Sequence, residues 1–170
     1  MKRTLTALAL AFALVVSAAA HAADPVDFTL ETSSGSSEAL AAYRGKVVVV
    51  FYEDRHHTET NAKVKEAVAR YGLENKLQDK VVVLAVANLK GYDFAPASTI
   101  ARQAIRAIAS RFGISIWLDW KGIVIDKLGV QDSNANVVVV DKNGAPAWKK
   151  SGRLGDAEQR DLLTAVSAAL

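Results

Sequence analysis

One short segment holds most of the side chains that could do chemistry. Residues 53–59 read Glu-Asp-Arg-His-His-Thr-Glu and directly follow the apolar run of residues 46–52. Imidazole and carboxylate groups together can ligate Zn²⁺, Cu²⁺ or Ni²⁺. An imidazole that titrates near neutral pH can also act as a general base. The segment is therefore the first candidate for a functional site.

A metal site in this segment would use His56 and His57 with Glu53 and Glu59. Side chains of adjacent residues diverge on a regular element. We therefore expect at most one of the two histidines to join Glu53, Asp54 or Glu59 at one ion. The spacing matches no established ligand motif. A solvated polar loop that caps a helix is the alternative interpretation.

Two other chemistries are open to the same loop. Arg55 and His56, with the free N–H groups of a helix that starts near Thr58, would favour an anion, although the flanking glutamates oppose it. A hydrolase would also need a nucleophile, and Thr60 and Ser98 qualify only by residue type. Nothing resembling a nucleophile elbow is present, so catalysis without cysteine stays a third hypothesis.

The N-terminus has the pattern of a secretory signal peptide. A basic start (Lys2, Arg3) precedes an apolar stretch over residues 5–16, and Ala20-His21-Ala22 is a cleavage signal of the A-x-A type. We expect cleavage after Ala22, a mature chain of 148 residues (170 − 22) and a periplasmic location. No later stretch approaches the roughly 20 apolar residues of a spanning helix, so we expect no membrane insertion.

Composition narrows the classes of function. The formal charge of the whole chain is +3, and Lys2 and Arg3 account for two of these charges, which leaves +1 on residues 23–170. No dense Lys/Arg run with interleaved aromatics remains, so we expect no nucleic-acid partner. The chain contains no cysteine, so thiol–disulfide exchange and cysteine-peroxidase chemistry are excluded.

Hydrophobic patterning predicts an α/β domain over residues 23–170. Continuous β-branched runs at residues 46–52 and 81–87 indicate strands buried on both faces. The helix between them begins at Thr58 and ends near Tyr71, which makes a parallel β-α-β unit. Further strands are expected at residues 28–32, 114–118, 136–140 and 145–149, with helices at 123–128 and from Asp156, where Gln159 completes a capping box.

A second long helix is expected from Ser98 or Thr99 to Gly113. Its apolar positions recur at helical spacing and predict a core-facing side. Arg102 and Arg106 should point outward. The expected core positions are Ile100, Ala101, Ala104, Ile105 and Ile108.

This element order resembles the thioredoxin fold with an N-terminal extension and an insertion. The segments 118–122, 128–130 and 137–144 are similar to the exported TlpA and peroxiredoxin-like branch, whose usual run is D-x-x-G, F-G-V and P-T-x-F-L-I-D-x-x-G. Within that branch, the chain resembles the cysteine-free exported family called YtfJ. The resemblance covers residues 26–170 and implies a thioredoxin-like central mixed sheet flanked by helices.

The chain departs from the redox members of that group at their reactive positions. The first and second redox cysteines would fall near His56 and Glu59, and a peroxidatic cysteine near Thr60. The cis-proline position before the hairpin strand is Ala135, where we expect a trans bond because a non-proline cis bond costs about 3–4 kcal/mol.

We therefore predict a non-catalytic, exported binding or accessory protein whose partner is an envelope protein. The binding surface would combine residues 53–60 with residues 88–98, where Tyr92 and Phe94 could join Trp120 in an aromatic cluster. A periplasmic metal-binding protein that uses His56 and His57 is the alternative.

Overall fold

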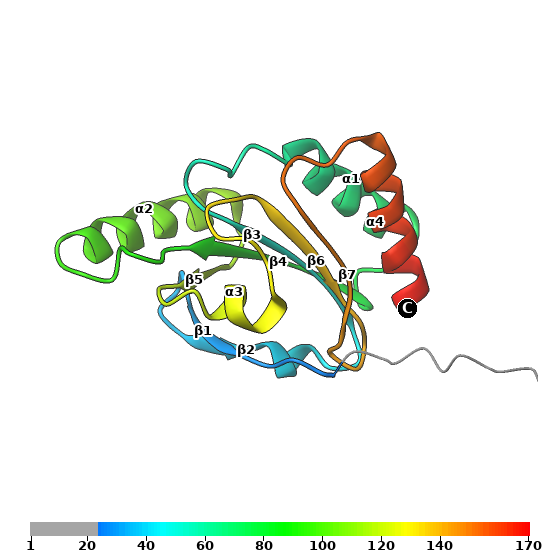
Figure 1. The fold of residues 1–170 in the computed structure, drawn as a ribbon, viewed down its shortest axis with the longest axis horizontal. Helices are drawn as coiled ribbons and strands as arrows, with labels where there is room; N and C mark the ends of the chain where they lie inside the picture. Colours follow the sequence, from blue (N-terminus) through cyan, green and yellow to red (C-terminus); the bar gives the residue numbers. More distant parts are fainter. Residues whose placement is uncertain (1–23) are drawn as a thin grey trace, which may run out of the picture.

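The computed structural model describes residues 24–170, and the predicted signal peptide lies outside this range. Seven strands form one mixed sheet (Figure 1). The strands are β1 (Thr29–Thr32), β2 (Ser37–Ala39), β3 (Val47–Glu53), β4 (Val81–Asn88), β5 (Ile116–Asp119), β6 (Asn136–Val140) and β7 (Pro146–Ser151). The helices are η1 (Leu40–Tyr43, a 3-10 turn), α1 (Ala62–Glu74), α2 (Ala97–Phe112), α3 (Ile123–Leu128) and α4 (Asp156–Ala169).

The sheet runs in the order β2-β1-β5-β4-β3-β6-β7. β3 and β4 pair in parallel, with Val47 opposite Val81, and α1 connects them as the predicted β-α-β unit. β5 is also parallel to β4, whereas β6 pairs antiparallel with β3. The N-terminal extension adds β1 and β2 beyond β5.

Both faces of β3 are covered, as its unbroken apolar sequence predicts, but the same prediction is wrong for β4, where Val83 is 47% exposed. On one face Val47, Val49 and Phe51 pack with residues of α1 and α4. On the other face Val48, Val50 and Tyr52 pack with residues of α3, η1 and β1. Figure 1 shows α1 and α4 together on one side of the sheet and α3 on the other. The side chains of β3 are therefore fully enclosed, which explains its lack of alternation.

The first long helix begins later than predicted. Residues 55–61 form successive turns, and α1 begins at Ala62 instead of Thr58. The buried Asn61 fixes this start, because its side chain accepts a hydrogen bond from the Leu154 N–H at 2.9 Å and donates to the Gly152 carbonyl at 3.0 Å. These partners lie about 90 residues away, so local sequence could not reveal them. The helix also continues past Gly72 to Glu74.

The second long helix has the predicted length but not the predicted burial. Ala109 is the one residue of α2 that is buried, and Ile100 and Ile108 are 62% and 48% exposed. The two arginines expected to point outward are partly or fully exposed but also bond to the N-terminal segment: Arg102 to the Glu31 carboxylate of β1, and Arg106 Nε to the carbonyl of Ser33 in the following turn at 3.2 Å. The predicted core side of this helix is therefore wrong.

The other predicted helices and strands begin and end within a few residues of the observed ones. β5 begins at Ile116 because the Ile114 N–H still bonds to Ala109 at the end of α2. The last helix has Gly155 at its N-cap, and the Gly155 N–H donates to Glu158 Oε2 at 3.1 Å. The predicted capping box with Gln159 is therefore wrong, since Glu158 makes this contact and glycine has no side chain to return it. β6 and α3 have the predicted bounds. Among the described residues the recorded cis peptide bond is Ala95–Pro96, so the bond before Ala135 is trans, as expected.

Candidate functional site

The chemically rich loop lies at the carboxyl end of the central parallel strands. In the parallel register Glu53 at the end of β3 is opposite Ala87 near the end of β4. The connections that follow, residues 54–61 and 89–96, therefore leave the sheet at the same edge. Open α/β sheets bind ligands at this edge. The topology thus brings together the two segments that we predicted as one binding surface.

Asp54 organises the loop. Its Oδ1 accepts a hydrogen bond from the His56 N–H at 2.8 Å and lies 2.7 Å from His57 Nδ1. The His56 ring turns the other way, and its Nε2 accepts a hydrogen bond from Arg55 Nε at 3.0 Å. The two imidazoles are therefore engaged by different partners, and the loop is held by its own side chains.

Glu53 is a buried carboxylate beside the loop. Only 8% of the residue is exposed, and Oε2 accepts a hydrogen bond from Lys65 Nζ at 2.5 Å. Its Oε1 has no hydrogen-bond partner among residues 24–170. Burial raises the pKa of Glu53 above its ordinary value, and the Lys65 ammonium opposes this effect without cancelling it.

The aromatic residues of the site do not act as one cluster. The Arg55 guanidinium lies 5.6 Å from the centroid of the Tyr92 ring and so joins the two segments. Phe94 is 60% exposed. Trp120 is engaged elsewhere, where its indole N–H donates to Glu31 at 3.1 Å and Arg102 lies over its ring.

The geometry of the loop does not gather the metal ligands named from the sequence. Glu53 is paired with Lys65, and His57 with Asp54. Within residues 24–170, no three His, Asp or Glu side chains are grouped closely enough to hold an ion.

A pocket of about 900 Å³, here named the α2 groove, is lined by residues of the loop and of α2. Its lining consists of Glu53–His56 and Thr58, residues 87–92 at the end of β4, Asp132 and Ser133, and one side of α2. The α2 side is apolar and contains Ala97, Ile100, Ala101, Ala104, Ile105 and Ile108. These residues include the whole set that the sequence placed in the core.

Strand order explains the shape of the α2 groove. α2 contacts β5, the loop extends from β3, and β4 lies between these two strands. Leu84 and Val86 point into the core on the α3 side, so Val83, Ala85 and Ala87 face the groove side of the sheet. Val83 is 47% exposed. Of β4, only Ala87 and Asn88 at its carboxyl end line the groove, with the polar loop on one side and the apolar side of α2 on the other.

A polar network closes one part of the groove. The Asn88 side chain donates to Asp132 Oδ1 at 2.9 Å, and Lys90 Nζ lies 2.9 Å from Asp132 Oδ2. Lys90 and Asn88 hold the pKa of Asp132 below its usual range, while Asp132 raises the pKa of Lys90. The pair is solvent-exposed, so it adds little stability. Its effect is to fix the segment before β6 against the end of β4.

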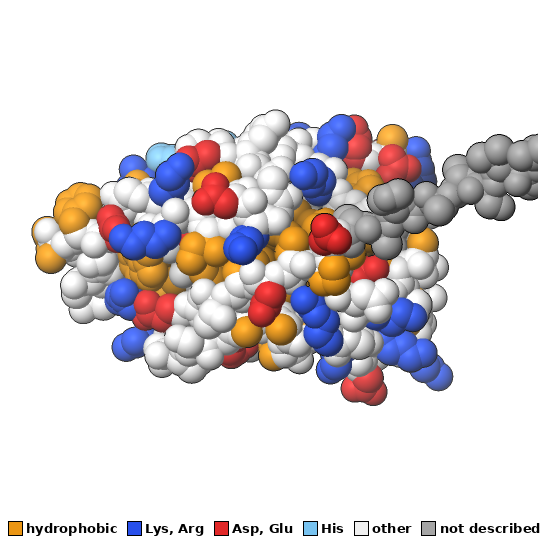
Figure 2. Space-filling view, turned by 60° about the horizontal axis from the view of Figure 1, so that its bottom comes forward, with side chains coloured by type: hydrophobic (Ala, Val, Ile, Leu, Met, Phe, Trp, Pro, Cys, Tyr) orange, Lys and Arg blue, Asp and Glu red, His pale blue; other side chains and the backbone are white. Residues whose placement is uncertain are grey.

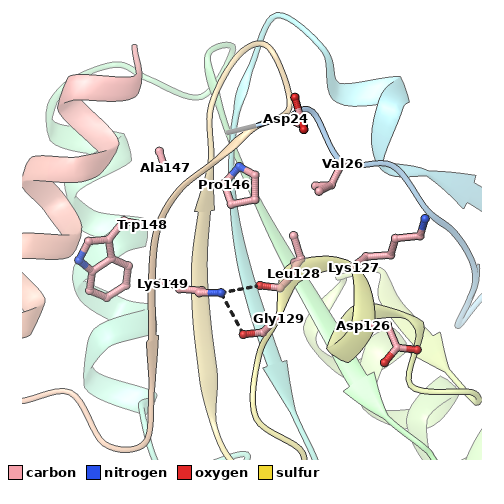
Figure 3. Close-up of a pocket in the computed structure, with 10 residues that line it drawn as sticks. All are labelled: Asp24, Val26, Asp126, Lys127, Leu128, Gly129, Pro146, Ala147, Trp148 and Lys149. Atoms are coloured by element: carbon pink, nitrogen blue, oxygen red, sulfur yellow. Dashed lines mark hydrogen bonds between the residues drawn. The ribbon is translucent and has the colours of Figure 1, made fainter. Parts of the chain in front are cut away.

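A second hollow, of about 620 Å³, lies between α3, β7 and the start of the described chain. Figure 3 shows Lys149 reaching across it, where Nζ donates to the carbonyls of Leu128 and Gly129 at 3.1 and 3.0 Å. The ammonium satisfies the carbonyl end of α3, as basic residues often do at helix termini. Trp148 points away toward the α1 and α4 face. This hollow is therefore explained by packing.

The fold defines the class of protein: the chain has a thioredoxin-like fold. A DsbF homologue from Corynebacterium diphtheriae is similar over 85% of each chain, with 19% identity and a TM-score of 0.63. A secreted disulfide oxidoreductase of Mycobacterium tuberculosis is similar over 83% of this chain and 95% of its own, with 18% identity and a TM-score of 0.55.

The exposed lipoprotein thioredoxin of Streptococcus pneumoniae is a third similar structure. It matches over 81% of this chain and 98% of its own, with 17% identity and a TM-score of 0.57. No protein-family model and no curated protein matches the chain. In residues 24–170, no helix has both the length and the apolar character needed to cross a bilayer.

Proposed function

We propose that this protein is an exported, non-catalytic binding protein that has replaced a thiol site with a docking surface. The observation that carries the proposal is the α2 groove. It lies open at the edge of the sheet where ligands bind in open α/β folds. The neighbouring loop has no thiol and is occupied by its own hydrogen bonds.

Export and family are parts of the same proposal. The signal-peptide pattern of residues 1–22 supports a periplasmic location. The similar structures include one named as secreted and one named as an exposed lipoprotein. The motifs of residues 118–144 support a place near the YtfJ family, which would make loss of cysteine a property of the whole group. The partner would be a protein of the cell envelope.

The exposed apolar residues of α2 support a protein partner. Large exposed apolar surfaces on a monomer mark interaction sites more often than single exposed side chains do. Among the described residues, α2 carries three exposed large apolar side chains, Ile100, Ile108 and Phe112. Figure 2, seen from below the view of Figure 1, shows hydrophobic side chains with Lys and Arg beside them at the end of the molecule that carries α2. An apolar surface with a charged margin is typical of protein interfaces.

Site-specific photo-crosslinking in cells that produce the protein tests the proposal. A photoreactive side chain at Ala104 lies in the α2 groove, and the same side chain at Arg160 on α4 is the control. We expect one adduct of defined mass from position 104 alone, lost when Ile108→Gln or Tyr92→Ala is added. The same adducts from both positions would contradict a docking surface at the groove.

A further inference from the structure

The α2 groove differs in polarity across its width. One side is the apolar stripe of α2, in which Ile100, Ala104 and Ile108 are spaced four residues apart. The other side is the polar loop with Arg55 and His56. A ligand that lies along the groove must therefore be apolar on one long side and polar on the other. A single acyl chain does not have this property, whereas an amphipathic helix does.

The dimensions also fit a helix. Ala97 and Ile108 are eleven helical steps apart, or about 16 Å, which equals three turns of a partner helix. Alanines at positions 97, 101 and 104 leave space between the isoleucines. Rows of side chains spaced four residues apart pack into the corresponding rows of a second helix. The α2 stripe therefore offers grooves for the large apolar side chains of another helix.

The charged residues of the groove determine which charge a partner should carry. Two acidic residues of the lining are paired with lysines, Glu53 with Lys65 and Asp132 with Lys90. Asp54 is bound to His57, a contact that is an ion pair only when the imidazole is protonated. Among residues 24–170, Arg55 forms no ion pair with a carboxylate, and Tyr92 holds its guanidinium next to the groove. A carboxylate is thus the group that would complete the site.

We infer that the α2 groove binds an amphipathic helix of a partner protein, with the apolar side of that helix on α2 and a carboxylate on its polar side paired with Arg55. This inference rests on the proposed function and specifies the chemistry of the partner. A second copy of α2 does not meet the requirement, because residues 97–112 contain three arginines and no Asp or Glu. α1 and α4 do carry carboxylates, but their apolar sides are already buried against the sheet, so the partner helix is assigned to a different protein.

Two designed peptides provide the test. Both are 16-residue helices with leucines at every third or fourth position, which form an apolar side. The opposite, polar side carries glutamates in the first peptide and lysines in the second. Binding to the expected mature protein, residues 23–170, is measured by isothermal titration calorimetry. We expect the glutamate peptide to bind at least tenfold more tightly than the lysine peptide, and Arg55→Glu to reverse that order. Arg160→Glu, on α4, is the control for net charge.

A matched pair of variants tests the apolar side. Ile108 and Ile114 are each 48% exposed, but only Ile108 lines the groove. We expect Ile108→Gln to weaken the glutamate peptide at least tenfold and Ile114→Gln to leave its affinity within twofold, with circular dichroism confirming that both variants are folded. Equal affinity for the two peptides, or equal effects of the two variants, would overturn the inference.

The remaining outcomes separate this inference from the proposed function. Binding of dodecanoate, lost in Ile108→Gln, without binding of either peptide would replace the helix with a small amphiphile. A dimer in sedimentation analysis that Ile108→Gln dissociates would replace it with a second copy. Either result overturns the helix inference, and the crosslinking experiment at Ala104 then decides whether the groove is still a docking surface.

Discussion

Glu53 is the residue whose ionisation is most closely connected to the fold beside the site. It is almost fully buried, its Oε2 is held by Lys65, and its pKa is raised by burial. Between the ordinary glutamate pKa and this raised value, the folded protein binds more protons than the unfolded chain. Its contribution to stability is therefore present at low pH and declines as the pH rises.

The corresponding prediction compares wild type with Glu53→Gln, which does not titrate. The free energy of unfolding of wild type, minus that of the variant, should fall as the pH rises above about 4.5 and then level off. Urea denaturation at half-unit pH steps measures this difference. Glu74→Gln, which removes an exposed carboxylate at the end of α1, is the control. A difference that rises with pH would contradict the assignment.

The two histidines carry a prediction about metal. Because His57 is bound to Asp54 and His56 faces Arg55, neither is arranged with two further ligands. Calorimetric titration with Zn²⁺, Cu²⁺ and Ni²⁺ should therefore give the same weak heats for the mature protein and for the His56→Ala/His57→Ala double variant. Stoichiometric uptake that the double variant loses would establish the metal-binding alternative.

At the scale of elements, α2 and α4 should respond differently to substitution. Leu162 on α4 is fully buried against the sheet, and Leu162→Ala should lower the free energy of unfolding by about 2–5 kcal/mol. Ile108 on α2 is half exposed, and Ile108→Gln should change it by no more than about 0.5 kcal/mol. Chemical denaturation measures both values. A loss above about 2 kcal/mol for Ile108→Gln would show that α2 is packed after all.

The contrast between these helices also explains which parts of the fold the sequence could predict. β3, β6 and α3 depend on short-range signals: continuous β-branched residues in the strands, and Gly122 and Gly129 at the helix ends. The apolar side of α2 was equally clear from periodicity. Periodicity identifies a side, however, and does not identify what covers it.

The contacts that decide the orientation of α2 come from distant residues. Glu31 lies 71 positions from Arg102, and Ser33 lies 73 positions from Arg106. An ion pair to β1 and a hydrogen bond to the turn after it hold the arginine side of α2 against the N-terminal segment and leave Ile100 and Ile108 exposed. The sequence thus located the loop and its neighbouring segment but could not reveal the groove between them.

At the scale of the whole molecule, stability depends on non-covalent packing alone. With no cysteine in the chain, the two apolar clusters on either side of the sheet must hold the fold together. The midpoint of thermal unfolding should therefore be the same, within error, with and without dithiothreitol. In an insulin-reduction assay, the rate of reduction with the protein should equal the rate with buffer alone. A midpoint that shifts with reductant would contradict this account.

The two edge strands of the sheet determine whether another chain can add a strand to it. β2, at one edge, is only three residues long. β7, at the other, begins with Pro146, which has no N–H to donate, and its register against β6 shifts between Val139 and Val140. Such edges are poor templates for adding a foreign strand. Recognition through shared backbone ladders, and the fibrillar aggregation that it invites, is therefore disfavoured on both sides of this molecule.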